Sequence, residues 1–420
     1  MQKTLDQKLA NIHADPFGAK DFILADAKDA DMAFGIGAPG QSPESHAGEA
    51  RDRNLADYRD QIKQIIEQGL VDIMLMSAST NDVLTYRDKL FEKSAVTPAC
   101  RANDTSDVFV VRGGKYLEIP AKPFRSASLD HIQCGHVACT DDERSRGTNL
   151  GLYSVTLNNR LEDDLRTLEA YQTFRIEAEA KGFRHFLEVF NPNAPHELNS
   201  AEIPAFINDH IARTLAGVAY AGRPVFLKIV YQGPKAMQEL VSYDPHLVVG
   251  ILGGSAGTTY DAFKLVSEAQ KYGARAALFG RKINQAESQL AFVEFLRLIL
   301  DGKISPEEAV KAYHGVLQHL RIKPRRSLAE DMELQTAVMS YGGSATVSLP
   351  VDVAKQVAGH ANADKNAHHD CGCGGPVKSA CSCESKPDTA ALSTDKPDFS
   401  KMSAAEKLAW NKARRDQIFG

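Results

Sequence analysis

Long apolar runs are missing from this chain of 420 residues. No stretch approaches the roughly eighteen consecutive apolar residues of a membrane-spanning helix, which excludes a transmembrane helix. The first residues, MQKTLDQKLANIHADPFG, contain no apolar core long enough for a signal peptide, so we expect a cytoplasmic protein. An excess of basic charge is missing too, because 49 Lys and Arg oppose 54 Asp and Glu and leave a net charge of −5. This balance offers no positive field to duplex nucleic acid or to an anionic membrane.

Cysteine is scarce and unevenly placed. The chain has seven cysteines, of which four gather in one short segment at Cys371, Cys373, Cys381 and Cys383. The other three, Cys100, Cys134 and Cys139, lie in the body of the chain. An odd number of cysteines without an export signal argues against a disulfide framework.

Composition divides the chain into three parts. Residues 1–345 have the mixture of apolar and charged residues that is typical of a folded domain. Residues 346–400 are poor in large apolar side chains over most of their length and predict a flexible linker, because such a segment cannot bury enough surface to offset its ordering entropy. Residues 401–420 have a short helical pattern.

Short apolar runs alternate with long amphipathic stretches within the folded part. Eight runs predict strands: 22–26, 72–77, 95–99, 152–157, 185–190, 225–231, 247–254 and 274–280. Helices are predicted between most of them, for example over 50–69 and 159–182, and a later helix is expected to begin with Ser305 as N-cap. Eight buried strands that alternate with helices predict an α/β fold of the (β/α)8 TIM-barrel class. A doubly wound sheet is the alternative, but no G-x-G-x-x-G follows the first strand.

An insertion follows the third predicted strand. About fifty residues there lack a clear helical pattern, and the text DVFVVRGGKYLEIP alternates apolar and polar residues around Gly113 and Gly114. We interpret this text, residues 107–120, as a β-hairpin. It would lie at one rim of the barrel, as a lid or as a contact between subunits, and we expect a homo-oligomer.

Charged residues interrupt three of the predicted strands. Lys228 lies in the apolar run VFLKIVY, where burial would depress its pKa and prepare it for attack on a carbonyl. Glu188 lies in the neighbouring strand, from which its carboxylate could move protons for the amine. Asp26 ends the first strand, with Lys28 two residues on. The alternative for Lys228 and Glu188 is a structural ion pair.

Glycine-bearing turns follow the seventh and eighth predicted strands. GILGGSAGTTYDAF contains Gly253, Gly254 and Ser255, and ALFGRKINQ contains Gly280 and Arg281. In barrels of this class the loops after strands seven and eight form the usual phosphate site. We therefore expect these five residues to bind a phosphate group.

These segments resemble the second half of the class I (Schiff-base) aldolases, in particular the archaeal-type fructose-bisphosphate, tagatose-bisphosphate and deoxyribose-phosphate aldolases. The resemblance extends over residues 183–290 and more thinly over 20–100. It implies Lys228 as the Schiff-base lysine, Glu188 and Asp26 as proton carriers, and a phosphorylated sugar or aldehyde as substrate, with no metal or other cofactor. The alternatives are another Schiff-base lyase or transaldolase, and a non-catalytic barrel that serves as scaffold or binds sugar phosphates.

The sequence departs from that family at two places. Archaeal fructose-bisphosphate aldolases are expected to carry a tyrosine proton donor on the fifth strand, where this chain has Glu188 followed by the loop Asn191-Pro192-Asn193. After the third strand, Arg101, Asn103 and Asp104 either reach a second phosphate or the sugar hydroxyls, or form an Asx-type turn that opens the insertion.

Two segments contain metal-ligating residue types. HIQCGHVAC holds His131, Cys134, His136 and Cys139, but its spacing matches no common zinc pattern, so we expect no metal in the barrel. The tail HHDCGCGGPVKSACSC offers His368, His369 and four cysteines, which could bind zinc or copper; a tail without function is the alternative.

The last segment predicts a helix that begins at a capping box of Ser403 and Glu406. Its apolar side suits docking on a partner protein, and the layout resembles the tail peptides that recruit enzymes into bacterial microcompartments. The alternative is a helix that folds back on its own barrel or on a neighbouring subunit.

Overall fold

The computed structural model describes residues 2–46, 49–111, 113–254 and 257–336. The expected boundary near residue 345, the linker over 346–400 with its cysteines and histidines, and the helix over 401–420 lie outside the described residues. Of the described residues, 2–43 and 51–336 with their gaps belong to one compact unit. No helix of the described part is long and apolar enough to cross a membrane.

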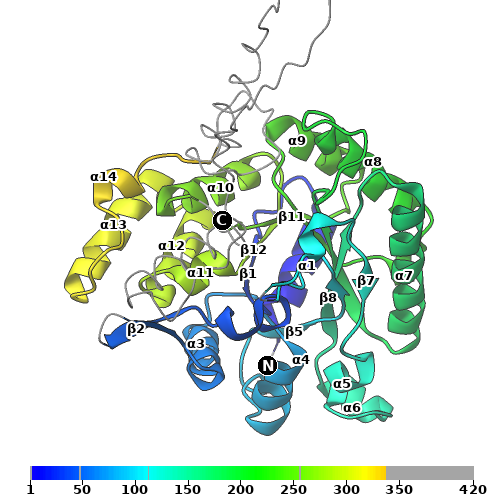
Figure 1. The fold of residues 1–420 in the computed structure, drawn as a ribbon, viewed down its shortest axis with the longest axis horizontal. Coiled ribbons are helices and arrows are strands. Elements are labelled where there is room, and N and C mark those ends of the chain that lie inside the picture. Colours follow the sequence, from blue (N-terminus) through cyan, green and yellow to red (C-terminus); the bar gives the residue numbers. More distant parts are fainter. Residues whose placement is uncertain (1, 47–48, 112, 255–256, 337–420) are drawn as a thin grey trace, which may run out of the picture. The chain divides into compact units, whose positions relative to one another are not determined.

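Eight parallel strands close into a barrel, which confirms the predicted (β/α)8 class (Figure 1). Around the barrel their order is β1-β4-β5-β8-β9-β10-β11-β12, so each strand pairs with its neighbours in the chain. The strands are β1 (Ile23–Lys28), β4 (Ile73–Met76), β5 (Thr97–Arg101), β8 (Leu150–Thr156), β9 (Arg184–Phe190), β10 (Leu227–Ile229), β11 (Val249–Leu252) and β12 (Ala276–Phe279). Each overlaps one of the eight predicted runs.

Helices surround the barrel and follow the predicted punctuation. They are α1 (Thr4–Ala14), α2 (Asp31–Phe34), α3 (Leu55–Gln68), α4 (Ala78–Asn81), α5 (Leu129–Cys134), α6 (Asp141–Arg146), α7 (Leu161–Ala180), α8 (Ile203–Ala216), α9 (Pro234–Tyr243), α10 (Thr259–Lys271), α11 (Arg281–Gln285), α12 (Gln289–Leu300), α13 (Pro306–His319) and α14 (Leu328–Asp331). A π-helical turn, Asp82–Arg87, extends α4. The predicted Ser305 cap is confirmed: its side chain accepts from Glu308 N, and the Glu308 side chain closes the box.

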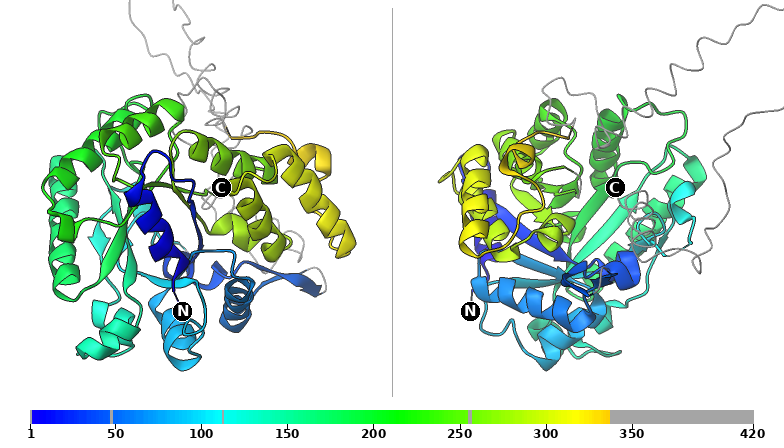
Figure 2. Two further views of the ribbon diagram at one scale, coloured as in Figure 1. Left: turned by 180° about the vertical axis from the view of Figure 1, so that it is seen from behind. Right: turned by 60° about the vertical axis from the view of Figure 1, so that its left-hand side comes forward.

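The inside of the barrel is an apolar core that is separate from the larger core between strands and helices. Alternate residues of the strands fill it, among them Ala25, Leu75 and Phe186. Helix α1 contributes Leu5, Leu9 and Ile12 to this inner core and lies across the barrel end in Figure 2. The amino-terminal end of the barrel is therefore plugged by apolar side chains, which leaves the carboxyl end for polar chemistry.

The insertion between β5 and β8 differs from the predicted hairpin. In the described part of 107–120 no residue belongs to a strand; a short antiparallel pair, β6 (Asp104–Thr105) with β7 (Pro123–Phe124), flanks it instead. The side chain of Asn193, in the loop after β9, donates to the carbonyls of Leu117 (3.2 Å) and Ile119 (2.7 Å). Backbone groups that a hairpin would have paired with each other bond to Asn193 instead. The hairpin predicted over 107–120 from the alternating pattern is therefore wrong.

Two further features were not predicted. The strands β2 (Gln41–His46) and β3 (Glu49–Asp52) form a two-stranded sheet between β1 and α3. A disulfide joins Cys134 to Cys139 between α5 and α6, contrary to the argument from the odd cysteine number. That argument counted cysteines along the chain, whereas pairing depends on how closely a local turn brings two of them together.

Candidate active site at the carboxyl end of the barrel

Polar side chains replace apolar ones at the carboxyl end of the barrel. Ser154, Glu188 and Lys228 occupy paired positions of the neighbouring strands β8, β9 and β10. Paired residues of parallel strands point to the same face, so their side chains lie side by side. Ser154 and Glu188 each lie two residues after an apolar residue that fills the barrel, Leu152 and Phe186, so they point to the inside as well.

Lys228 and Glu188 form the centre of this group. The ammonium Nζ of Lys228 lies 2.6 Å from Oε1 of Glu188, and both side chains are at least nine-tenths buried. The other oxygen, Oε2 of Glu188, accepts a hydrogen bond from Ser154 Oγ at 2.6 Å. The predicted approach of Lys228 and Glu188 is therefore what the structure shows, and it gives the amine an immediate proton acceptor.

Arg101 contacts Glu188 from β5, on the other side of β8. Its guanidinium lies 3.6 Å from Glu188 Oε2, 2.6 Å from Asp29 Oδ2, and donates to Ser154 Oγ at 3.2 Å. Burial alone would lower the pKa of Arg101, but the carboxylates of Asp29 and Glu188 raise it above its usual value. We expected Arg101 to bind substrate or phosphate; in the structure its guanidinium contacts Asp29, Ser154 and Glu188.

Asn103 and Asp104 attach the insertion to the barrel. The side chain of Asn103 donates to the carbonyl of Ser154 at 2.8 Å and accepts from its N–H at 2.6 Å, which extends the sheet. Asp104 Oδ2 accepts from both the N–H and the hydroxyl of Ser126. Both side chains bond to backbone groups of other segments, and these bonds are not the Asx-type turn that was the alternative.

The insertion also contributes a carboxyl group, Asp107. Its Oδ2 accepts from the hydroxyl of Thr156, which ends β8, at 2.7 Å. The other oxygen, Oδ1, is buried and has no hydrogen-bond partner among the described residues. Burial raises the pKa of Asp107, and the negative charge of Glu188 raises it further. Asp107 is thus a second carboxyl group within electrostatic reach of Glu188.

Asp26 lies elsewhere. Asp26 lies two residues after Leu24 in β1, and both side chains point outward from the barrel. Its Oδ2 lies 3.4 Å from the Nζ of Lys28. Lys28 in turn donates to Gln289 at the start of α12, so this pair belongs to the layer between strands and helices. Burial raises the pKa of Asp26 to about 6. The acid near the end of β1 that pairs with Arg101 is Asp29, three residues further on.

The predicted phosphate-binding glycines lie at the ends of two neighbouring strands. Gly253 follows β11 and donates to the carbonyl of Leu278 in β12, and Gly280 follows β12. A Cβ on Gly253 would lie 2.2 Å from the ring of Phe279, so only glycine allows this approach. Gly254 has a φ of +56°. Ser255 lies outside the described residues.

Arg281 opens α11 directly after Gly280. Burial lowers its pKa, and the carboxylate of Glu188 opposes that change, so the guanidinium lies within electrostatic reach of Glu188. Next to it, Lys282 donates to the carbonyls of Gly257 (2.6 Å) and Thr258 (3.1 Å) and thereby joins the loops after β11 and β12. The candidate anion site and the Lys228 group thus share one end of the barrel.

Sequence reasoning missed three members of the group: Asp29, Asp107 and Ser154. Ser154 and Thr156 alternate with apolar residues at the end of a predicted strand, a signal that was available. Asp29 has the parity of Ala25 and Ala27, but it follows the strand, where alternation no longer assigns a direction. Nothing in the local sequence indicates that Asp107 reaches Thr156.

Comparison with known proteins identifies the fold. No family model matches the chain, and no curated protein matches its sequence. A solved structure of fructose-bisphosphate aldolase from Slackia heliotrinireducens is similar over 74% of this chain and 91% of that one, with 12% identity and a TM-score of 0.52. This barrel is built like that of an aldolase. An archaeal fructose 1,6-bisphosphate aldolase is similar over 70% of this chain and 99% of that one, with 13% identity and a TM-score of 0.49.

Proposed function

We propose that this protein is a class I aldolase that cleaves or forms a carbon–carbon bond of a phosphorylated sugar through a Schiff base on Lys228, without a metal. The observation that carries this proposal is the buried pair of Lys228 Nζ and Glu188 Oε1, 2.6 Å apart at the carboxyl end of a barrel. The fold likeness to the Slackia heliotrinireducens aldolase supports it. The half-buried Arg281, directly after β12, supports a phosphorylated substrate.

The mechanism begins with a proton transfer. Lys228 passes a proton to Glu188, and the neutral amine attacks the substrate carbonyl to give a carbinolamine. Glu188 returns the proton to the carbinolamine oxygen, water leaves, and an iminium forms. The Glu188 carboxylate then accepts the proton of the hydroxyl next to the bond that breaks, and the bond electrons move into the iminium to give an enamine. The carbonyl fragment formed by this cleavage leaves as the first product. Protonation of the enamine and addition of water then release the second product and restore Lys228.

Two neighbours complete this chemistry. Arg101 and Ser154 hold Oε2 of Glu188 and leave Oε1 directed at Lys228. Asp107, with its raised pKa and its unpartnered Oδ1, is the second acid in our mechanism, the role expected for Asp26. We expect the Asp107→Asn substitution to slow carbinolamine dehydration about 100-fold while leaving phosphate affinity unchanged.

Borohydride trapping tests the proposal. The protein is incubated with dihydroxyacetone phosphate or fructose bisphosphate, reduced, digested and mapped by mass spectrometry. We expect one reduced adduct, on the peptide that carries Lys228, and none in Lys228→Arg. The buried Lys28 and Lys282 are internal controls on the same map. Substrate binding without an adduct would replace the enzyme by a sugar-phosphate-binding barrel, and an adduct without cleavage products would indicate another Schiff-base lyase or a transaldolase.

The wider setting of the protein remains a set of proposals. We propose that the active form is a homo-oligomer in the cytoplasm and that residues 401–420 dock on a partner. Deletion of 401–420 tests the last point: aldolase activity should survive, whereas co-purification with the partner should be lost.

A further inference from the structure

A tight loop between α5 and α6 brings together four side chains of metal-ligating types. The loop is far along the chain from β10, which carries Lys228. The loop runs from Cys134 to Cys139, whose Cα atoms are 6.0 Å apart. Gly135 and Ala138 have positive φ angles of 84° and 62°, and these two left-handed positions turn the backbone back on itself. The loop therefore has the wrapped backbone that places side chains around one point.

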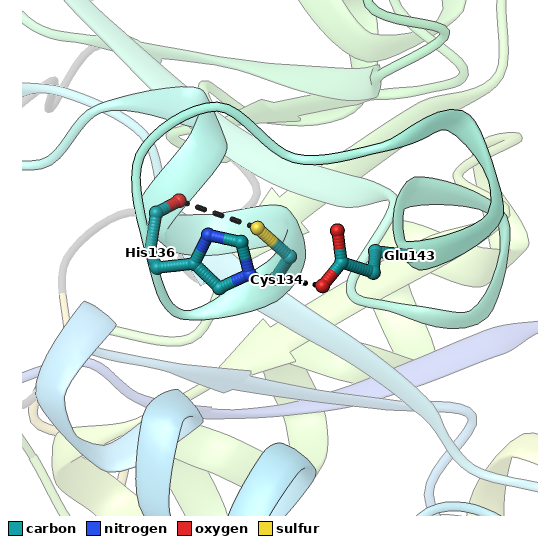
Figure 3. A group of neighbouring side chains, drawn as sticks. All are labelled: Cys134, His136 and Glu143. Atoms are coloured by element: carbon teal, nitrogen blue, oxygen red, sulfur yellow. Dashed lines mark hydrogen bonds and ion pairs between the residues drawn. The ribbon is translucent and has the colours of Figure 1, made fainter.

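Cys134, His136 and Glu143 direct one donor atom each to this point (Figure 3). The sulfur of Cys134, a ring nitrogen of His136 and a carboxylate oxygen of Glu143 all lie within 4.8 Å of one another. Cys139 adds a fourth donor, because its sulfur is bonded to that of Cys134. Two sulfurs, one imidazole nitrogen and one carboxylate oxygen make a donor set that suits tetrahedral zinc.

The hydrogen bonds orient the donors for a metal ion. His136 Nδ1 lies 2.9 Å from the carbonyl oxygen of Val137 and donates its proton to it, which leaves Nε2 as the ring nitrogen that faces the other donors. That Nε2 lies 2.9 Å from Oε1 of Glu143. The other oxygen, Oε2, accepts from the N–H and hydroxyl of Thr140 in the capping box of α6. Nε2 and Oε1 thus share one proton, and their outer partners Val137 and Thr140 keep them in place when a metal ion takes the position of that proton.

We propose that this loop binds one Zn²⁺ ion when Cys134 and Cys139 are reduced, through both sulfurs, His136 Nε2 and Glu143 Oε1. A dithiol reductant supplies two electrons and two protons: the Cys134–Cys139 bond breaks, both cysteines become thiols, and the reductant becomes a disulfide. Zinc then binds the two thiolates and releases their two protons. In the tetrahedral site the sulfurs lie about 3.8 Å apart, so side-chain rotation separates them without opening the loop.

The disulfide and the zinc ion are therefore alternative cross-links of the same loop, Cys134 to Cys139. The site is open to solvent, since the side chain of His136 is 54% exposed, so an ion can enter without unfolding. The loop belongs to the crossover from β5 to β8: the side chain of Gln133 donates to Lys181 O, beyond the end of α7, and Asp130 pairs with Lys181 and Arg144. The cross-link fixes this crossover in oxidising conditions through the disulfide and in reducing conditions through the ion. The ion has no part in the chemistry of Lys228.

Cobalt titration tests the proposal in the full-length chain. The background variant carries serine at Cys371, Cys373, Cys381 and Cys383, so that the tail offers no thiolate. After anaerobic reduction with a phosphine, Co²⁺ should bind at about one ion per chain and give thiolate charge-transfer and tetrahedral visible bands. Zinc should displace it. The oxidised protein should bind none, because the sulfurs are consumed in the disulfide.

Single substitutions separate a built site from adventitious binding. His136→Ala and Glu143→Gln should each weaken zinc binding about 10-fold or more, and the double variant Cys134→Ser with Cys139→Ser should abolish the charge-transfer band. His131→Ala is the matched control, because that ring is bonded to Ser128 outside the donor set. Equal binding by oxidised and reduced protein, or bands that survive the double variant Cys134→Ser with Cys139→Ser, would overturn the proposal. So would the absence of any band from the reduced protein.

Discussion

The structure predicts that Glu188→Gln destabilises the fold much more than removal of its partner Lys228 does. Glu188 has three partners, Lys228, Ser154 and Arg101, whereas Lys228 has Glu188 as its partner among the described residues. Arg101 keeps a second carboxylate in Asp29. Loss of the Glu188 charge thus leaves Lys228 as a buried cation without a counter-charge, while loss of Lys228 leaves Glu188 still bonded.

The expected magnitudes follow from these partners. Removing one member of a buried ion pair costs roughly 3–5 kcal/mol. We expect about 3 kcal/mol for Glu188→Gln, because the amide oxygen still accepts one bond from Lys228. Lys228→Met should cost about 1 kcal/mol, since Glu188 retains Ser154 and Arg101. The double variant should be more stable than Glu188→Gln alone, because it contains no unpaired ammonium.

Urea unfolding followed by circular dichroism at neutral pH measures this order. The midpoint should fall at least about twice as far for Glu188→Gln as for Lys228→Met, with partial recovery in the double variant. Ser154→Ala, which removes one hydrogen bond of the same carboxylate, is the matched control, with a loss of about 1 kcal/mol. Equal losses for the two single variants, or additive losses in the double variant, would show that the charges of Lys228 and Glu188 are not coupled.

Two other predictions concern stability and phosphate binding. Burial lowers the pKa of His185 to about 3, below that of an unfolded histidine, so its stabilising effect is complete above pH ~6.5 and is lost as the pH falls toward 3. His185→Gln, which keeps an acceptor for the hydroxyl of Tyr171, should therefore flatten the acid side of a melting-temperature profile; an unchanged slope would refute it. Gly253→Ala would place a Cβ against Phe279 and should cost about 1–3 kcal/mol and weaken phosphate binding measured by calorimetry. Gly315→Ala, with open space around the added Cβ, should do neither.

The sequence alone determined the barrel. Its eight strands are short apolar runs buried on both faces, and the helices between them carry their own start and stop signals, such as Ser305 and Gly69. These signals are local in the chain, so no tertiary information was needed to find them. The same local reasoning found Lys228 and Glu188, because a charge inside an apolar run is visible in the sequence, and neighbouring strands of a barrel place them side by side.

The tertiary structure alone decided which other side chains join them. Asp26 and Asp29 are both acids near the end of the first strand, but only the parity of the folded strand directs Asp29 toward Arg101 and leaves Asp26 in the helix layer. Asp107 reaches Thr156 because Asn193 and Asn103 hold the insertion against the barrel. Such contacts join residues far apart in the chain, and the free energy that selects them comes from packing and hydrogen bonding that no local pattern encodes.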